Sequence, residues 1–144
     1  MRRTRRRVAI TALLILAVIM LGCDQGTARQ LALASNAVSI GLDNTQEAII
    51  AGVNSGVVPV PEAEVVNAEL RNVAQAGLAL NQAIRDNLDK NAVDAQLDVV
   101  LVAFDRLVST GAARITNPET RLAISTALNG ARVALATIAS VVRG

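Results

Sequence analysis

The sequence predicts an all-α fold, an up-down antiparallel bundle of four helices, and three observations lead to this prediction. The apolar residues are mainly alanine, leucine, valine and isoleucine, and Phe104 is the single aromatic residue. Alanine is the best helix former, whereas strand-rich domains draw on aromatic side chains. Four segments repeat apolar residues at alternating spacings of four and three, which keeps one side of each helix apolar. Short connections between these segments favour antiparallel neighbours.

The first helix is expected over residues 27–54. Thr27 and Gln30 have the spacing of a capping box, in which each side chain bonds to the other residue's backbone amide. Gly56 interrupts the pattern shortly after the segment ends. The stripe that faces the core is expected to be Leu31, Ser35, Val38, Leu42, Thr45, Ile49 and Gly52.

The second helix is expected over residues 61–90. Pro61 suits the first helical position, where an amide hydrogen would be unpaired in any case. Glu62 and Glu64 complement the positive end of the helix dipole. The expected stripe is Val66, Leu70, Val73, Gly77, Leu80, Ile84 and Leu88.

The third helix is expected over residues 92–110 and is the shortest of the four. Asn91 is its expected N-cap, with Asp94 three residues on, and Gly111 is expected to end it. The expected stripe is Leu97, Leu101, Phe104 and Val108. An alternative fuses the second and third segments into one long helix. Polar residues such as Asn87 occupy the positions where the apolar stripe of one long helix would continue. They argue against that alternative.

The fourth helix is expected over residues 117–143 and has the strongest start signal in the chain. Asn117 is its expected cap, with Pro118 first and Glu119 second in the helix. The expected stripe is Ile124, Leu128, Ala131, Leu135, Ile138 and Val142.

The N-terminus has the pattern of a secretory signal that ends in a processing site. Five arginines precede a short apolar run that begins at Val8, and a small residue precedes the only cysteine of the chain. The segment Met20-Leu21-Gly22-Cys23 resembles the lipobox of bacterial lipoprotein signals. Met20 stands where that family usually has leucine.

The resemblance covers residues 1–24 alone, and it implies a lipid anchor. It implies that residues 1–22 are a signal peptide that is cleaved, and that Cys23 then carries a diacylglycerol and an N-acyl chain. The mature protein is then residues 23–144, the size of a single domain. In enteric-type bacteria an aspartate directly after the lipidated cysteine resembles a signal for retention in the inner membrane. Asp24 therefore predicts the periplasmic face of the inner membrane, with the outer membrane as the alternative.

Three other interpretations of the N-terminus are weaker. A helix over residues 8–22 would span roughly 22 Å, whereas the hydrocarbon core of a bilayer is about 30 Å thick. A cleaved signal therefore fits better than an uncleaved anchor. Cys23 could also be an ordinary buried thiol, but its place directly after the apolar run favours processing. The arginines at 5–7 loosely resemble a twin-arginine export motif, and we favour general secretion.

The charge distribution excludes a nucleic-acid partner. The formal charge of the whole chain is +2, and loss of the five arginines of the signal changes it to −3. The remaining basic residues are spread evenly, whereas nucleic-acid binding needs a basic patch. The expected partners are the membrane, through the lipid anchor, and another protein of the cell envelope.

The chain offers little chemistry for catalysis, and we expect no enzyme activity, no metal and no cofactor besides the acyl groups. It contains no histidine, the commonest general base and metal ligand. One acidic cluster is present, which comprises Asp86, Asp89, Asp94, Asp98 and Asp105. A calcium loop needs a turn glycine among its ligands, and none lies between the first four aspartates. The favoured interpretation is a solvated face near a helix–helix turn.

Two features are candidates for contacts. Val57, Val58 and Val60 make the connection after the first helix unusually apolar, and Ile115 lies in the facing connection. These side chains either close over the end of the core, which we favour, or form an exposed contact for a partner. Gly77, on the second stripe, permits close helix contact, for which packing within the bundle is favoured over a homo-oligomer.

The expected function is that of a lipid-anchored, non-catalytic scaffold or protein-binding module of the cell envelope. The composition is also broadly similar to small alanine-rich lipoproteins of phages and prophages, which implies a role in lysis or superinfection exclusion. A membrane-surface module that inserts when the bundle opens is a further alternative. The major outer-membrane lipoprotein of enteric bacteria is also helical. It attaches to peptidoglycan through a C-terminal lysine, whereas this chain ends at Gly144. The same attachment to peptidoglycan is therefore not expected.

Overall fold

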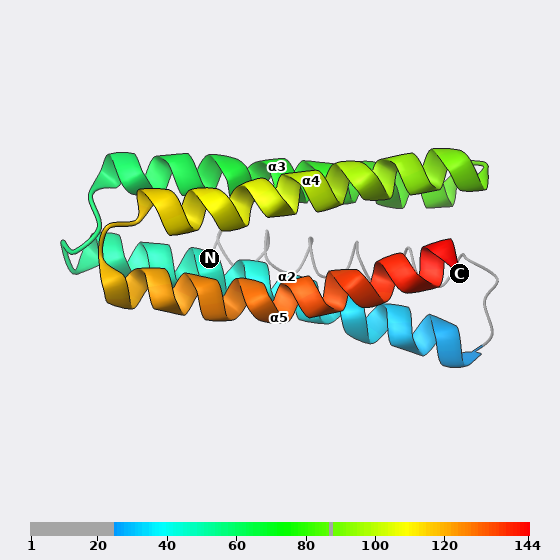
Figure 1. The fold of residues 1–144 in the computed structure, drawn as a ribbon, viewed down its shortest axis with the longest axis horizontal. Helices are drawn as coiled ribbons and strands as arrows, with labels where there is room; N and C mark the ends of the chain where they lie inside the picture. The colour runs from blue at the N-terminus through cyan, green and yellow to red at the C-terminus, as the bar shows by residue number, and fades with distance from the viewer. Residues whose placement is uncertain (1–24, 87) are drawn as a thin grey trace, which may run out of the picture.

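The computed structural model describes residues 25–86 and 88–144, which form an antiparallel bundle of four α-helices (Figure 1). The helices are α2 (Gln25–Asn54), α3 (Val60–Arg85), α4 (Lys90–Arg114) and α5 (Pro118–Arg143). This part of the chain contains no strand. The prediction of an all-α, up-down four-helix bundle is therefore confirmed.

The helices run alternately in opposite directions, so the bundle has two different ends. The connections 55–59 and 115–117 lie at one end, here called the loop end. The turn between α3 and α4, the first residues of α2 and the last residues of α5 lie at the other end, here called the terminal end (Figure 1). α2 has 30 residues. A helix of that length extends about 45 Å, which is roughly the distance between the two ends.

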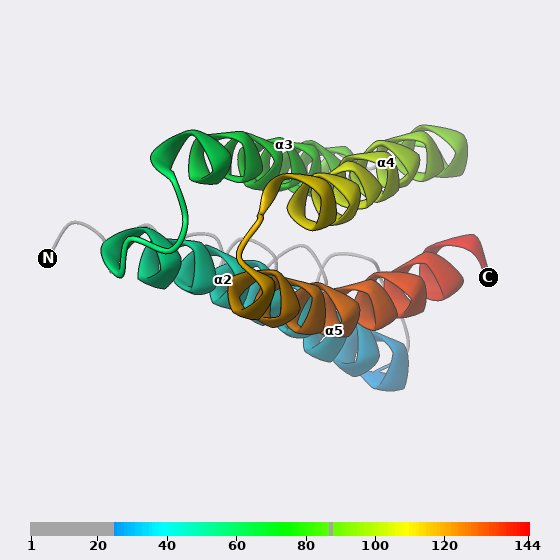
Figure 2. The same ribbon diagram turned by 60° about the vertical axis from the view of Figure 1, so that its left-hand side comes forward.

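The four helices pack as two pairs. α2 lies mainly against α5, and α3 lies mainly against α4, while the two pairs contact each other less extensively. Figure 2 shows the two pairs as separate layers. The α3–α4 pair is a helical hairpin, whereas the α2–α5 pair joins the first and the last helix of the described chain.

Two glycines of α2 allow close packing between helices and loops. A Cβ atom at Gly41 would lie 2.7 Å from the Cβ atom of Ala131 on α5. At Gly52, a Cβ atom would lie 2.5 Å from Cγ2 of Val58. Gly77 differs, because no described atom lies within 4 Å of the place where its Cβ would be. The favoured interpretation, in which Gly77 permits close packing within the bundle, is therefore wrong.

The core runs along the length of the bundle, between the inward faces of the helices. Buried members of the predicted stripes of α2, α3 and α5 include Leu31, Val38, Ile49, Val66, Val73, Leu80, Ile124, Leu128 and Leu135. In α4 the buried line is Val93, Leu97, Val100, Phe104, Leu107 and Gly111. Two predicted stripe residues of α4, Leu101 and Val108, lie at its edge and are half-buried. Full burial of each large apolar side chain contributes about 1.5–3 kcal/mol.

The turn between α3 and α4 begins earlier than expected, so the predicted range 61–90 for the second helix is too long. α3 ends at Arg85, and Asp86 is its C-cap. The Asp86 carboxylate accepts a hydrogen bond from Nε2 of Gln82 at 2.8 Å, which supports the last turn of the helix. Leu88, placed on the predicted stripe, lies after the helix and is 48% exposed.

The N-cap of α4 is Asp89, and the prediction of Asn91 is wrong. Oδ1 of Asp89 accepts a hydrogen bond from the backbone amide of Ala92 at 2.9 Å. A carboxylate two residues before Asn91 thus satisfies one of the free amides of the first turn. Asn91 consequently lies inside the helix, and its side chain is exposed.

α4 also ends later than the predicted range 92–110, because Gly111 does not terminate it. The helix continues to Arg114, and Gly111 is buried inside it. A Cβ atom at Gly111 would lie 3.2 Å from Cγ2 of Ile124, so the glycine makes room for α5. The basic residue Arg114 in the last turn complements the negative end of the helix dipole.

Of the predicted N-caps of α5 and α2, the first is confirmed and the second is wrong. Asn117 caps α5 as predicted, since its Oδ1 accepts a hydrogen bond from the amide of Thr120 at 2.9 Å and Pro118 follows it. In α2 the chain is already helical at Gln25. Thr27 therefore lies inside the helix and is not its N-cap.

Candidate functional site

The predicted lipidation residue Cys23 and sorting residue Asp24 lie outside the described residues. α2 includes Gln25, the second residue after Cys23. Two extended residues span at most about 7 Å. A lipid on Cys23 would therefore be attached close to the start of α2, at the terminal end of the bundle.

The four side chains expected at the loop end divide into two groups. Val58 is 2% exposed and Ile115 is 1% exposed, and both belong to the core. Val57 is 47% exposed and Val60 is 55% exposed. Val58 and Ile115 therefore close the loop end of the core, as the favoured interpretation expected. They are not available as partner contacts, so of these four residues Val57 and Val60 alone offer exposed apolar surface.

A tight turn after α2 determines which of these valines is buried and which is exposed. Gly56 has a φ of 76°, in the left-handed region that glycine adopts without steric cost. The amides of Val57 and Val58 both donate to the carbonyl oxygen of Gly52 at 3.0 Å, in the manner of a helix C-cap. The reversal brings Val58 against Gly52, where a larger residue would not fit.

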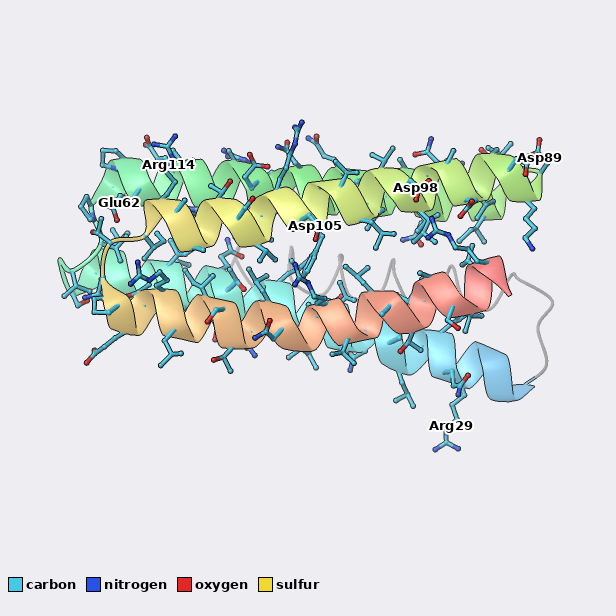
Figure 3. All side chains as sticks on the ribbon, in the orientation of Figure 1. Arg29, Glu62, Asp89, Asp98, Asp105 and Arg114 are labelled. Carbon is cyan, nitrogen blue, oxygen red and sulfur yellow. The ribbon has the colours of Figure 1, made fainter. Side chains whose placement is uncertain are left out.

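Glu62 links the second connection to α3. Its Oε2 accepts a hydrogen bond from the amide of Thr116 at 3.1 Å, and its Oε1 accepts one from the Thr116 hydroxyl at 3.0 Å. Glu62 lies in the first turn of α3, near the end of α4 (Figure 3). The connection after α4 is therefore fastened to the α3–α4 pair.

The predicted acidic cluster is distributed over several structural contacts and does not form one site. Nε of Arg143 donates to Oδ1 of Asp94 at 2.7 Å, and Nη2 of Arg143 donates to Oδ1 of Asp98. Nζ of Lys90 donates to the carbonyl oxygen of Arg143 at 3.3 Å. These four residues are here called the Arg143 cluster. The hydrogen bonds that Arg143 donates to Asp94 and to Asp98 raise the pKa of Arg143, so its guanidinium remains charged.

The other aspartates of the predicted cluster have separate roles. Asp105 pairs with Arg132 of α5 at 3.3 Å, further from the terminal end than Asp98 (Figure 3). Asp89 caps α4, and Asp86 accepts a hydrogen bond at the end of α3. Within residues 25–86 and 88–144, no three acidic, histidine or cysteine side chains gather as metal ligands.

An open groove of about 700 Å³ lies between α3 and α4, and it was not expected from the sequence. Its lining includes Glu69, Asn72, Asp98, Val99, Val102 and Arg106. The groove depends on which faces of two separate helices meet, and no motif in either segment indicates that pairing. Its mixed charged and apolar lining does not define a particular chemistry.

Exposed apolar side chains are also found on the α2–α5 pair. Among the residues that the structure describes, the three most exposed large hydrophobic residues are Val133 at 70%, Leu122 at 67% and Leu33 at 62%. α5 is the one helix of the described residues that is long and apolar enough to cross a membrane by length and composition. Its inward face nevertheless supplies core residues such as Ile124 and Leu128.

Comparison with models of known protein families, with curated proteins and with solved structures found no match to this chain.

Proposed function

We propose that this protein is a lipid-anchored, non-catalytic helical bundle that binds another protein of the bacterial cell envelope. The observation that carries the proposal is the segment Met20-Leu21-Gly22-Cys23, which follows a basic head and a short apolar run. The start of α2 at the second residue after Cys23 is consistent with an anchor at the terminal end. On this proposal the protein is exported and retained at the periplasmic face of the inner membrane.

The exposed apolar residues at the loop end support a binding role. Val57 and Val60 are about half exposed at the end of the molecule furthest from the proposed anchor. Exposed apolar surface on a soluble domain commonly marks a contact with another protein. A bundle about 45 Å long would hold this surface away from the bilayer, where it could reach a partner.

Fractionation of the cell envelope tests the anchor. The unaltered chain is expected in the membrane fraction, and the Cys23→Ser variant is expected either as an uncleaved precursor or released from the membrane. One acyl chain binds a membrane only marginally, and two or three make the attachment stable. Membrane association that is unchanged by Cys23→Ser would contradict the proposal.

Site-specific photo-cross-linking tests the binding surface. A photo-reactive residue in place of Val60 is expected to cross-link a partner in intact membranes. The same residue in place of Gln46, which is exposed on α2 away from both ends, is the control. Equal cross-linking from both positions would argue against a specific contact at the loop end.

A second candidate function is a membrane-surface module that inserts its last helix. The observation in its favour is that the most apolar window of α5 has a mean hydropathy of 1.4 and is only 28% buried in the bundle. An environment-sensitive dye on Val133→Cys, with Cys23→Ser as the background, would report insertion into anionic phospholipid vesicles. A blue shift of the dye would favour this function, and an unchanged spectrum would exclude it under those conditions.

A further inference from the structure

The α2–α5 pair has an outer face that carries almost no charge. Figure 2 shows this pair as one layer, so each of its helices has a side turned away from α3 and α4. On that side, exposed residues recur at alternating spacings of four and three and form two rows, here called the outer rows. The row of α2 is Leu33, Ala37, Ile40, Asn44, Glu47 and Ala51, and the row of α5 is Leu122, Thr126, Asn129, Val133, Ala136 and Ser140. Glu47 is the one charged member of the two rows.

The outer surface of the α3–α4 pair is different. Its exposed residues include the charged side chains Glu64, Arg71, Asp98 and Arg106. A helix face that stays in water normally carries such charges. The outer rows instead contain four large apolar side chains that the bundle leaves exposed, which are Leu33, Ile40, Leu122 and Val133. Exposed apolar surface of this kind is typical of a contact with another molecule.

Two contacts inside the α2–α5 pair show which residues of the outer rows lie at the same height. A Cβ atom at Gly41 would lie 2.7 Å from the Cβ atom of Ala131, and one at Gly52 would lie 3.1 Å from Oγ1 of Thr120. The two helices are antiparallel and rise 1.5 Å per residue. Counted from these contacts, Ile40 lies level with residues 130–133, Asn44 with residues 126–129, and Ala51 with residues 120–122.

A second copy of the chain fits this surface when a two-fold axis runs parallel to the bundle. Such an axis keeps the heights and places α2 of one copy over α5 of the other. Ile40 then meets Val133 of the second copy and the exposed Gly130, at which no described atom occupies the space of a Cβ. Asn44 meets Thr126, so a polar side chain faces a polar side chain. The two rows are therefore complementary to each other along their length.

The charged residues near the outer rows favour the same arrangement. Glu47 of one copy lies within about one helical turn, in height, of the exposed Arg121 of the other. Two copies that point in opposite directions would instead place α2 over α2. At full overlap that arrangement brings Glu47 against the apolar region around Ala37, where desolvation of the carboxylate is costly.

The outer face is also large enough for a stable dimer. α5 has 26 residues, so it is about 39 Å long, and two adjacent helices are roughly 20 Å wide. The footprint is thus about 800 Å². Stable protein–protein interfaces of standard size bury about 800 Å² on each partner.

We infer that two copies of this protein associate in the same direction through the outer rows, with α2 of each copy against α5 of the other. Both loop ends then lie on one side of the dimer, so Val57 and Val60 are presented twice and a bivalent partner would bind more tightly than a monovalent one. This inference goes beyond the proposed function and does not depend on a lipid at Cys23.

Sedimentation velocity over a range of concentrations tests the association. The sample is the full chain with Cys23→Ser in a mild detergent, and we expect a reversible dimer. Val133→Glu is expected to raise the dissociation constant at least about tenfold, because it places a carboxylate in the contact. Val102→Glu is the matched control, since Val102 on α4 is 57% exposed and Val133 is 70% exposed. Circular dichroism verifies that both variants remain helical.

Three results of this measurement would overturn the inference. The first is a chain that stays monomeric at all concentrations. The second is an equal effect of Val133→Glu and Val102→Glu. The third is a monomeric chain that binds vesicles of phosphatidylcholine and phosphatidylglycerol less well after Val133→Glu, which would assign the outer rows to the bilayer surface.

Disulfide formation between single-cysteine variants tests the direction of the copies and does not require a disruptive substitution. Ile40→Cys and Val133→Cys are each made in the Cys23→Ser background, mixed to exchange subunits, and oxidised. We expect covalent dimers mainly between the two different variants, because α2 of one copy faces α5 of the other. Efficient disulfide formation by Ile40→Cys alone, or none in the mixture, would contradict the proposed arrangement.

Discussion

Gly41 and Gly77 are both glycines in the middle of a helix, yet their surroundings in the fold are opposite. A Cβ atom at Gly41 would lie 2.7 Å from the Cβ atom of Ala131 and 2.8 Å from the backbone oxygen of Ala127. Backbone atoms of a packed helix cannot move independently, so α2 and α5 would have to separate. Gly77 faces open space, and there the absence of a side chain serves no packing role.

Alanine at these two glycines is expected to change stability in opposite directions. Gly41→Ala should lower the free energy of unfolding by about 1–3 kcal/mol, because overpacking forces the helices apart. Gly77→Ala should raise it by about 0.5–1 kcal/mol, because alanine is the better helix former. Urea unfolding followed by circular dichroism measures both. Equal stability of the two variants would show that α2 and α5 do not pack as closely as described.

At the scale of single elements, helix ends are determined by competition among neighbouring capping groups. Asp89 provides the hydrogen bond to the first turn of α4. Asn91, an equally good capping residue by type, lies inside the helix. The choice between two candidates that lie two residues apart depends on where the chain must reverse to bring α3 and α4 together.

Loss of the Asp89 cap should be measurable as a loss of stability. Asp89→Ala is expected to lower the free energy of unfolding by about 0.5–2 kcal/mol, the usual cost of an N-cap. Asn91→Ala is the matched control, and it should cost little because its side chain is exposed. If Asn91→Ala proved the more destabilising variant in thermal unfolding, α4 would begin where the sequence pattern predicted.

For the part of the chain that the structure describes, periodicity in the sequence was sufficient to predict the number of helices, their order and most of their buried faces. The start of α5 was also predictable, because Asn117 and Pro118 are adjacent and their signals agree. The end of α4 was not, since Gly111 is a frequent helix terminator but here makes room for Ile124 of another helix. Such a contact depends on tertiary packing, and no local pattern reports it.

Local sequence patterns also could not predict the packing at the loop end. Val57, Val58 and Val60 are equivalent in type, and the positive φ of Gly56 determines which of them turns toward the core. The sequence predicted two alternatives for the whole group, whereas the structure divides the group between them. The proposed lipidation motif is a pattern of contiguous residues, so its prediction does not depend on the fold.

Aspartate at Val58 and at Val57 should therefore have different effects. Val58→Asp places a charge in the buried end of the core and is expected to cost several kcal/mol or prevent folding. Val57→Asp should leave the melting temperature nearly unchanged and reduce partner capture from membranes. If Val57→Asp left partner capture at the level of the unaltered protein, the loop end would not be a binding surface.

At the scale of the whole molecule, the antiparallel order places the start of α2, the α3–α4 turn and the C-terminus together at the terminal end. A lipid at Cys23 would bring this end close to the bilayer. The connections 55–59 and 115–117 would then face away from it. An anchor at Cys23 would thus give the bundle a direction relative to the membrane.

Protease accessibility is expected to report this direction. A cleavage site inserted after Gly56 should be cut rapidly in membrane-bound protein, and the same site inserted after Leu88 should be cut more slowly. Both sites should be cut at similar rates in detergent, where no bilayer blocks access. Similar rates at the two sites in membranes would mean that the bundle does not stand on its terminal end.

Lipidation of Cys23, as the first residue of the mature protein, is the proposal on which the orientation and the anchor depend. Mass spectrometry of the N-terminal peptide from membrane-purified protein tests it directly. We predict a peptide that begins at Cys23 and carries the added mass of a diacylglycerol, with or without a further acyl chain. An unmodified Cys23 in a chain that still begins at Met1, or a mature chain that begins elsewhere, would contradict the account.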